Sequence, residues 1–149
     1  MLEFTKAGSS DALVLNSISK RAFDSDIAVG AASKSGAPGY MSLKFYVKTA
    51  NANHLYKLSL DRLIIGGAIL FLDGIKLNVE RIFVDPEHFR KGYGLFIMQK
   101  IEEMFSEAKE IYLDTPIWNI RTNAFYQKLG YNEYKKDDKF IYYIKKINI

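Results

Sequence analysis

The sequence contains no cysteine, and this absence removes several kinds of chemistry at once. Disulfide bonds, metal sites built from thiolates and a cysteine nucleophile are all excluded. Histidine is nearly as scarce, because His54 and His88 are the only two and they lie in different segments. We therefore expect neither a metal site nor metal-assisted catalysis.

Long apolar stretches are also missing. No run approaches the roughly 20 apolar residues that a helix needs to cross a membrane. Residues 1–6 lack the basic segment and the apolar core that together mark a secretory signal. These absences predict a cytoplasmic protein that does not bind membranes.

Neither sign of charge dominates. The 21 basic and 17 acidic residues give a net charge of +4, and the two signs are mixed along the chain. Such a small excess suits an anionic cofactor, but it is equally typical of an ordinary solvated surface. A nucleic-acid-binding protein would concentrate basic residues on one face, so we expect no nucleic-acid partner.

The sequence does contain enough apolar material for one core. Of its 149 residues, 48% are hydrophobic and 14% are aromatic, which is ample for a single domain spanning residues 1–149. Alternating or β-branched runs predict strands at 2–6, 55–60, 63–72, 76–84, 110–115, 131–135 and 140–146. Apolar spacings of three and four residues predict helices near 12–22, 41–48, 93–104 and 118–129. We therefore expect an α+β protein with a mixed, mostly antiparallel sheet flanked by helices.

Two glycine-rich segments carry predictions of their own. The stretch 30–39 is typical of a connector. The pair Gly66-Gly67 lies inside a predicted strand, where it indicates a bulge or the close approach of another backbone.

The most informative segment is a predicted strand, loop and helix at residues 81–104. The loop contains Gly92 and Gly94, which allow a ligand to approach the backbone closely. The first N–H groups of the helix that follows have no intrahelical partner and lie at the positive end of its dipole. This arrangement suits a phosphate or pyrophosphate group.

Two common phosphate-binding loops do not fit this segment. A P-loop requires glycine, four residues and then Gly-Lys-Ser/Thr, and that order is absent. The dinucleotide fingerprint requires a third glycine at position 97, which is Ile97. By itself, then, the Gly-x-Gly loop predicts only a tight turn before a helix.

A second motif makes the loop more specific. Residues 119–131 read Asn-Ile-Arg-Thr-Asn-Ala-Phe-Tyr-Gln-Lys-Leu-Gly-Tyr. Together with the loop, this segment resembles the two signatures of the GNAT superfamily, the acetyl-CoA-dependent N-acyltransferases. The matching positions are Gly92, Gly94, Asn119, Thr122, Tyr126, Gly130 and Tyr131. Phe89 departs from the family, which usually has Arg or Gln there; this affects a side-chain contact and leaves the backbone cradle intact.

The resemblance implies the GNAT fold and a binding site for acetyl-CoA or CoA. Two parallel strands, one ending at Val84, are expected to splay apart, and the pantetheine arm then pairs with the backbone of Ile82, Phe83 and Val84. Asn119 is expected to hydrogen-bond the pantetheine arm, and Lys128 to approach the adenosine phosphate. The residues expected at the pyrophosphate are Phe89, Arg90, Lys91, Gly92, Tyr93, Gly94 and Leu95.

The implied reaction is the direct attack of a primary amine on the thioester. An alkylammonium group has a pKa of about 10.4 and must first lose a proton, so a base is useful. Glu80 is the predicted base, with Asn78 binding a relay water, because strand alternation places both on the same face as Val84. A salt bridge between Glu80 and Arg81 is an equally good interpretation. Tyr126 is the predicted acid for the departing thiolate.

The acceptor is the least defined part of the prediction. In the family, the segment between the first two strands lines the acceptor site, so Phe23 and Tyr40 are candidates to contact the amine or simply to pack. The amine belongs to a small molecule or to a protein. Another acyl donor, and a non-catalytic acyl-CoA sensor or structural subunit, remain alternatives. The family also implies a homodimer.

Overall fold

The structure is a computed structural model that describes residues 1–31, 36 and 38–148. The strands are β1 (Leu2–Lys6), β2 (Leu55–Leu60), β3 (Leu63–Asp73), β4 (Lys76–Val84), β5 (Glu110–Pro116), β6 (Asn132–Lys136) and β7 (Phe140–Lys146). The α-helices are α1 (Ala12–Asp24), α2 (Leu43–Asn51), α3 (Tyr93–Met104) and α4 (Ile120–Lys128). Short 3₁₀ turns occupy Ser9–Asp11, Ser25–Val29 and Pro86–His88. The predicted connector at 30–39 lies partly outside the described residues.

The predicted mixed sheet is confirmed. In the described part of the chain, seven strands form one sheet in the order β1-β2-β3-β4-β5-β7-β6. The β4–β5 pair is parallel, and every other neighbouring pair is antiparallel. Each strand lies where alternation or β-branched runs predicted it, to within a residue at most ends.

Two helices begin later than predicted because a side chain caps each of them. Oγ of Ser42 accepts a hydrogen bond from the Phe45 N–H at 3.2 Å, which starts α2 at Leu43. Asn119 caps α4 in the same way, so this helix starts at Ile120. Across the residues that the structure describes, no helix combines the length and apolarity needed to cross a membrane. The expected cytoplasmic location stays a prediction.

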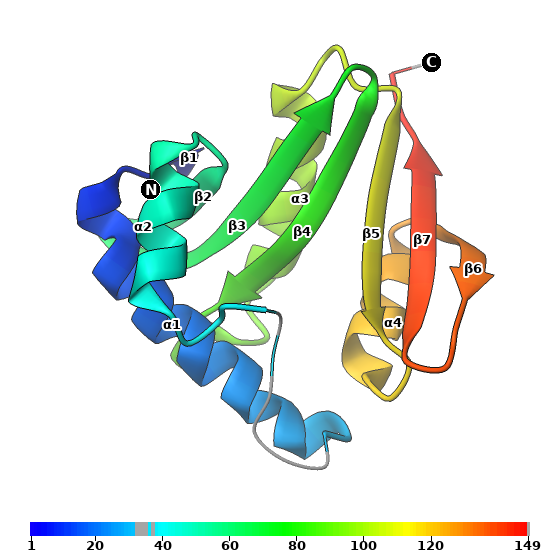
Figure 1. Cartoon of the computed structure of the whole chain (residues 1–149), viewed down its shortest axis with the longest axis horizontal. Helices are drawn as coiled ribbons and strands as arrows, with labels where there is room; N and C mark the ends of the chain where they lie inside the picture. Colours follow the sequence, from blue (N-terminus) through cyan, green and yellow to red (C-terminus); the bar gives the residue numbers. More distant parts are fainter. Residues whose placement is uncertain (32–35, 37, 149) are drawn as a thin grey trace.

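Helices cover both faces of the sheet (Figure 1). On one face, α1 and α2 enclose a core with residues of β2, β3 and β4. On the other, α3 and the Tyr126 side chain of α4 pack in a larger core that includes residues of every strand except β6. Figure 1 shows α3 behind β3 and β4, and α4 behind the lower ends of β5 and β7.

The glycine pair of β3 is confirmed as a place of close backbone approach. A Cβ atom on Gly66 would lie 2.6 Å from the carbonyl oxygen of Phe83. A Cβ atom on Gly67 would lie 2.7 Å from the carbonyl oxygen of Tyr56 and 2.8 Å from Leu15. All three distances are too short for a real contact, so only glycine fits at these two positions without movement of the surroundings.

We expect the Gly67→Ala variant to be less stable by about 1–3 kcal/mol, because the added methyl group overpacks the junction of β2, β3 and α1. Chemical denaturation of the two proteins measures this difference. Gly8→Ala is the matched control, since a Cβ atom there would meet only Oγ of Ser10, at 4.0 Å. Equal stability of wild type and Gly67→Ala would show that the close approach is not real.

β4 contains one residue more than β3 in the paired region. Ile69 of β3 lies opposite Arg81, but the next residue, Leu70, lies opposite Val79. Glu80 is therefore the extra residue of a β-bulge. Such a bulge bends the strand locally and interrupts the regular alternation of its side chains.

The bulge overturns one step of the sequence interpretation. Before it, Leu77 packs in the core on the α3 face, whereas after it Phe83 packs in the core on the α1–α2 face. Asn78 and Val84 consequently point to opposite faces of the sheet, because Val84 packs on the α3 face. The prediction that Asn78, Glu80 and Val84 share a strand face is wrong.

The parallel pair β4–β5 stays together only at its start. Pairing covers Lys76 with Glu110, Leu77 with Ile111 and Asn78 with Tyr112, and goes no further. Beyond this point the strands separate, as the widening space between β4 and β5 in Figure 1 shows. The predicted splayed pair is confirmed, and the edge of β4 that faces β5 is unpaired from Val79 onward among the described residues.

Candidate active site

A cleft of about 1250 Å³ lies between the separated strands. One wall is formed by β4 and the loop that leads into α3, and the other by β5, the residues after it and α4. Phe23, Asp26, Gly36 and Pro38 form a third side, which we call the N-terminal wall. The β6–β7 turn reaches the cleft with Asp138 and Lys139.

The loop before α3 presents backbone N–H groups to this cleft. Gly92 is the N-cap of α3 with φ of +79°, and Arg90 has φ of +63°. The first backbone hydrogen bond of the helix runs from the Phe96 N–H to the Gly92 carbonyl at 3.0 Å. The N–H groups of the preceding turn therefore have no intrahelical acceptor and lie at the positive end of the helix dipole. This is the geometry of an anion site.

Gly92 precedes α3 and Gly94 lies in its first turn, and the two glycines have different surroundings. A Cβ atom on Gly92 would meet no atom within 4 Å, so the backbone there is open, and the positive φ explains the glycine. A Cβ atom on Gly94 would lie 3.4 Å from Cζ of Phe125. This is an ordinary van der Waals contact, so the packing of α3 against Phe125 of α4 does not by itself require a glycine there.

Most of the residues predicted to bind the cofactor line the cleft. They are Ile82, Phe83, Val84, Phe89, Arg90, Gly92, Tyr93, Gly94, Leu95, Asn119 and Tyr126. Lys91 and Lys128 are exposed and do not line it. Lys128 is the last residue of α4, whereas the cleft takes mainly the earlier residues of this helix. Their predicted phosphate contacts stay predictions.

An arginine from α4 lies beside the position where the loop departs from the family pattern. The Arg121 guanidinium lies 4.8 Å from the centre of the Phe89 ring. It also forms an ion pair with Asp26 at 3.2 Å, while about half of its side chain remains exposed. Positive charge therefore reaches the loop from Arg121 as well as from Arg90, although position 89 itself is apolar.

Tyr126 lies on the opposite wall from the loop and is only 6% exposed. Its hydroxyl makes no hydrogen bond to any residue that the structure describes. Burial, together with the negative charge of Asp114, raises the pKa of Tyr126 well above its usual range. The phenol is therefore protonated at any physiological pH and can donate a hydrogen bond to a ligand.

Asn119 is also buried, but one of its side-chain atoms already makes a hydrogen bond. Oδ1 accepts a hydrogen bond from the Thr122 N–H at 3.1 Å and so caps α4. The Nδ2 group of Asn119 is then left to donate the predicted hydrogen bond to a pantetheine arm. Asn119 and Tyr126 both line the cleft, as their spacing predicted.

Glu80 lines the cleft. It also forms a salt bridge with Arg81, which was the alternative to a role as catalytic base. Its oxygens accept two hydrogen bonds from Arg81, one of them at 3.0 Å from Nη2. About a quarter of the Glu80 side chain is still exposed. Asn78 also lines the cleft, although the bulge separates its face from that of Val84.

The two aromatic candidates for the acceptor side are arranged one behind the other. Phe23 lines the cleft. Tyr40 packs edge-on against Phe23, with the ring centres 5.7 Å apart, and its hydroxyl donates to Asp24 at 2.8 Å. Tyr40 is buried and does not line the cleft, so the structure gives it a packing role.

The structure also brings in residues that the sequence interpretation missed. Asp114 of β5 lines the cleft, and partial desolvation there, together with the charges of Glu80 and Asp137, raises its pKa. The only sequence feature that could have indicated Asp114 as a site residue was its position in a strand that alternates buried and exposed residues. Nothing in the sequence pattern indicated that Arg121 belongs to the site, because its position there depends on the packing of α4 against the loop.

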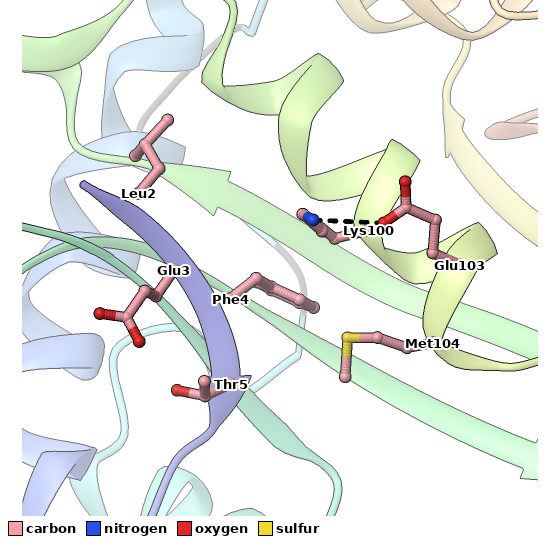
Figure 2. A pocket seen from close by; sticks show the side chains of 7 residues that line it. All are labelled: Leu2, Glu3, Phe4, Thr5, Lys100, Glu103 and Met104. Carbon is pink, nitrogen blue, oxygen red and sulfur yellow. Dashed lines mark ion pairs between the residues drawn. The ribbon is translucent and has the colours of Figure 1, made fainter.

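A second, smaller hollow of about 380 Å³ lies between β1 and α3 (Figure 2). Its floor contains Phe4 and Met104, and Lys100 and Glu103 form an ion pair of 3.2 Å at its rim. None of the predicted site residues lies there. The large cleft is therefore the candidate site.

Comparison with a protein-family description agrees with this geometry. The model of the "Acetyltransferase (GNAT) family" matches residues 30–131, which is more than half of the chain. The matched range includes the loop before α3, β5 and α4. No curated protein matches the sequence significantly.

Solved structures share the fold over the full chain. An N-acetyltransferase, PaiA, from Thermoplasma acidophilum in complex with coenzyme A is 19% identical, with a TM-score of 0.81 over 98% of this chain and 99% of the other. The ribosomal-protein-S18-alanine N-acetyltransferase of Escherichia coli is 18% identical, with a TM-score of 0.79 over 100% and 96%. A polyamine N-acetyltransferase of Drosophila melanogaster is 8% identical, with a TM-score of 0.72 over 99% and 100%.

Proposed function

Because the chain belongs to the acetyltransferase (GNAT) family, we propose that it moves an acetyl group from acetyl-CoA to a primary amine by direct attack on the thioester. The observation that carries this proposal is the cleft itself. One wall has a helix start with free N–H groups, which supports anion binding, and the buried Tyr126 and the Glu80 carboxylate line the same cleft.

Acetyl-CoA would lie along β4. The unpaired edge of this strand from Val79 to Val84 offers backbone groups to the pantetheine arm, as in the addition of a strand to a sheet. The pyrophosphate would then rest on the N–H groups of Gly92 to Leu95, with Arg90 and Arg121 nearby. The PaiA structure with coenzyme A supports a cofactor of this class in a protein of the same fold.

The chain's own residues would move two protons. Glu80, directly or through a water, would accept the proton of the ammonium group so that the amine can attack. A backbone N–H on the free edge of β4 would stabilise the developing charge on the thioester oxygen. Tyr126, which remains protonated, would donate a proton to the departing thiolate.

The amine acceptor would bind in the part of the cleft that is lined by the N-terminal wall and Asp114. Carboxylates at this end, Glu80 and Asp114, suit a cationic amine more than an anionic acceptor. The acceptor is a small molecule or a protein residue, and a homodimer stays a further proposal from the family.

Titration calorimetry with acetyl-CoA, followed by a thiol-release assay with a panel of primary amines, tests the proposed function. We expect micromolar binding and acetyl transfer to at least one amine. A well-folded protein that binds neither acetyl-CoA nor CoA would contradict the proposal. Binding without transfer to any amine, small or peptidic, would instead indicate a non-catalytic acyl-CoA-binding protein.

Glu80→Gln should lower kcat/KM for the amine about 10- to 30-fold at neutral pH, since solvent water only partly replaces the base. The loss should shrink as the pH approaches about 10, where an alkylamine is already neutral. Rate measurements from pH 6.5 to 9.5 show this, with Glu133→Gln on the exposed strand β6 as the control. A loss that is the same at every pH would contradict the role of base.

A further inference from the structure

The Arg81 guanidinium is enclosed beneath the cleft, with only 1% of its side chain exposed. Nε and Nη2 donate to the two carboxylate oxygens of Glu80, so the pair is bidentate. Nη2 also donates to the Pro38 carbonyl at 2.5 Å. Nη1 donates to the Tyr46 hydroxyl at 3.3 Å. One side chain therefore binds both the proposed base and the segment that precedes α2.

The bulge explains why an arginine can lie there. It turns Arg81 toward the face covered by α1 and α2, where the guanidinium lies 4.9 Å from the centre of the Phe45 ring. The Tyr46 hydroxyl, which accepts from Arg81, donates in turn to Ser19 of α1. The position of the guanidinium is thus set by β4 and both helices rather than by Glu80 alone.

The Pro38 carbonyl belongs to the N-terminal wall, and this wall is tightly packed. A Cβ atom on Gly36 would lie 2.6 Å from Cβ of Phe23 and 2.8 Å from Cγ of Tyr40. Because Gly36 rests directly on Phe23 and Pro38 lines the same wall, a shift of Gly36 or Pro38 would change the surface that the acceptor meets. The guanidinium holds this segment at the same time as it holds Glu80.

We propose that Arg81 is a positioning residue for the amine acceptor, which fixes the Glu80 carboxylate and the N-terminal wall in one arrangement. The inference rests on the proposed function, because it takes Glu80 as the proton acceptor. A planar fork of N–H groups is required for these contacts, and the single ammonium of a lysine cannot supply it.

Arg81→Lys keeps the charge and removes the fork. We expect kcat/KM for the amine to fall about 10-fold, with a higher KM for the amine, while the Kd of acetyl-CoA stays within about twofold. Arg62→Lys, in the exposed turn between β2 and β3, is the matched control, because it makes the same replacement at a residue that does not line the cleft. Normal kinetics in folded Arg81→Lys would overturn the proposal.

A double-mutant cycle separates positioning from general destabilisation. If Arg81 acts on kcat through Glu80, Arg81→Lys should change kcat less than about twofold in a Glu80→Gln background, because the base is already absent. The same fractional loss of kcat in both backgrounds would assign Arg81 a merely structural role.

Arg81→Lys leaves the hydrogen-bond acceptors around the buried side chain only partly paired and could therefore misfold. A second variant tests the proposal in that case. Arg81→Met with Glu80→Gln removes both charges together, which proteins tolerate better than the loss of one partner. Compared with Glu80→Gln alone, it should raise the KM of the amine about fivefold, because the Pro38 carbonyl loses its donor. An unchanged KM would contradict the link to the N-terminal wall.

A measurement without turnover distinguishes failure of this inference from failure of the proposed function. Hydrogen exchange of the backbone amides at Gly39–Ser42 should be faster in Arg81→Lys, since the segment loses its attachment to β4. Faster exchange in a protein that acetylates no amine would support the attachment and reject the proposed function. Unchanged exchange would overturn the inference whatever the activity.

Discussion

Replacing Tyr126 with phenylalanine should lower kcat about 100- to 1000-fold while leaving the Kd of acetyl-CoA nearly unchanged. The change removes one oxygen atom from a side chain that is otherwise packed. The ring contacts of Tyr126 with Phe125 and Tyr131, at 5.1 and 5.8 Å between ring centres, do not depend on the hydroxyl. Stability should therefore hardly change, and the loss should appear in the chemical step.

The size of the effect follows from the state of the phenol. Proton transfer to the departing sulfur stabilises the transition state of thiolate release, and the Tyr126 hydroxyl has no partner among the described residues that would compete for its proton. Burial and the charge of Asp114 raise its pKa, so the neutral form persists across the range in which enzymes are assayed. The ratio of wild-type to variant kcat should accordingly be constant from pH 6 to about 9.

Tyr143→Phe is the matched control for this experiment. Tyr143 is also a buried tyrosine, but its hydroxyl donates to Oδ1 of Asn123 at 2.7 Å and it does not line the cleft. Its loss should reduce stability by about 1 kcal/mol and leave kcat alone. A Tyr126→Phe enzyme with kcat within about threefold of wild type would exclude Tyr126 as the acid.

Gly92→Asp should weaken the binding of acetyl-CoA about 100-fold or more, because it places a carboxylate next to the proposed pyrophosphate position. Two unit charges at about 4 Å repel each other by up to about 4 kcal/mol at the surface of a protein, and tenfold in Kd corresponds to about 1.4 kcal/mol. Calorimetry at low salt gives the largest difference, since salt screens the repulsion.

The control for this variant is Gly92→Asn. Asparagine has nearly the same shape as aspartate and also tolerates a positive φ, and the structure leaves open space around a side chain at this position. Any effect of backbone strain is therefore shared, and only the charge differs. If both variants bind acetyl-CoA equally well, the anion does not lie against the start of α3. If both lose binding equally, charge is not the cause.

Much of the fold follows from short-range patterns in the sequence. Residues 140–146 alternate between the two faces of the sheet, and α3 places Ile97 and Ile101 at helical spacing, so both elements were predictable. The loop-to-helix geometry of the candidate anion site was predictable as well, because Gly92 and Gly94 indicate a loop before a helix and this geometry needs no tertiary contact.

The remaining features depend on contacts between distant segments. The bulge at Glu80 leaves no local mark, since its neighbours still read as a regular strand. Because of the bulge, the Arg81 side chain points toward α1 and α2, and Asn78 and Val84 lie on opposite faces of the sheet. The contact of Arg121 with Phe89 joins residues of α4 and the loop, and the spacing within either segment does not reveal it.

The separation of β4 from β5 also affects how the protein avoids unwanted association. A sheet usually has free strand edges only at its two rims, where other chains can pair with them. The rim strand β6 is fully exposed and carries Lys135 and Lys136, which discourage such pairing by their charge. On the free edge of β4 the two charged residues, Glu80 and Arg81, pair with each other, and this edge faces another strand of the same sheet. A partner can reach this edge only through the cleft between β4 and β5, so a chain that cannot enter the cleft cannot pair with it.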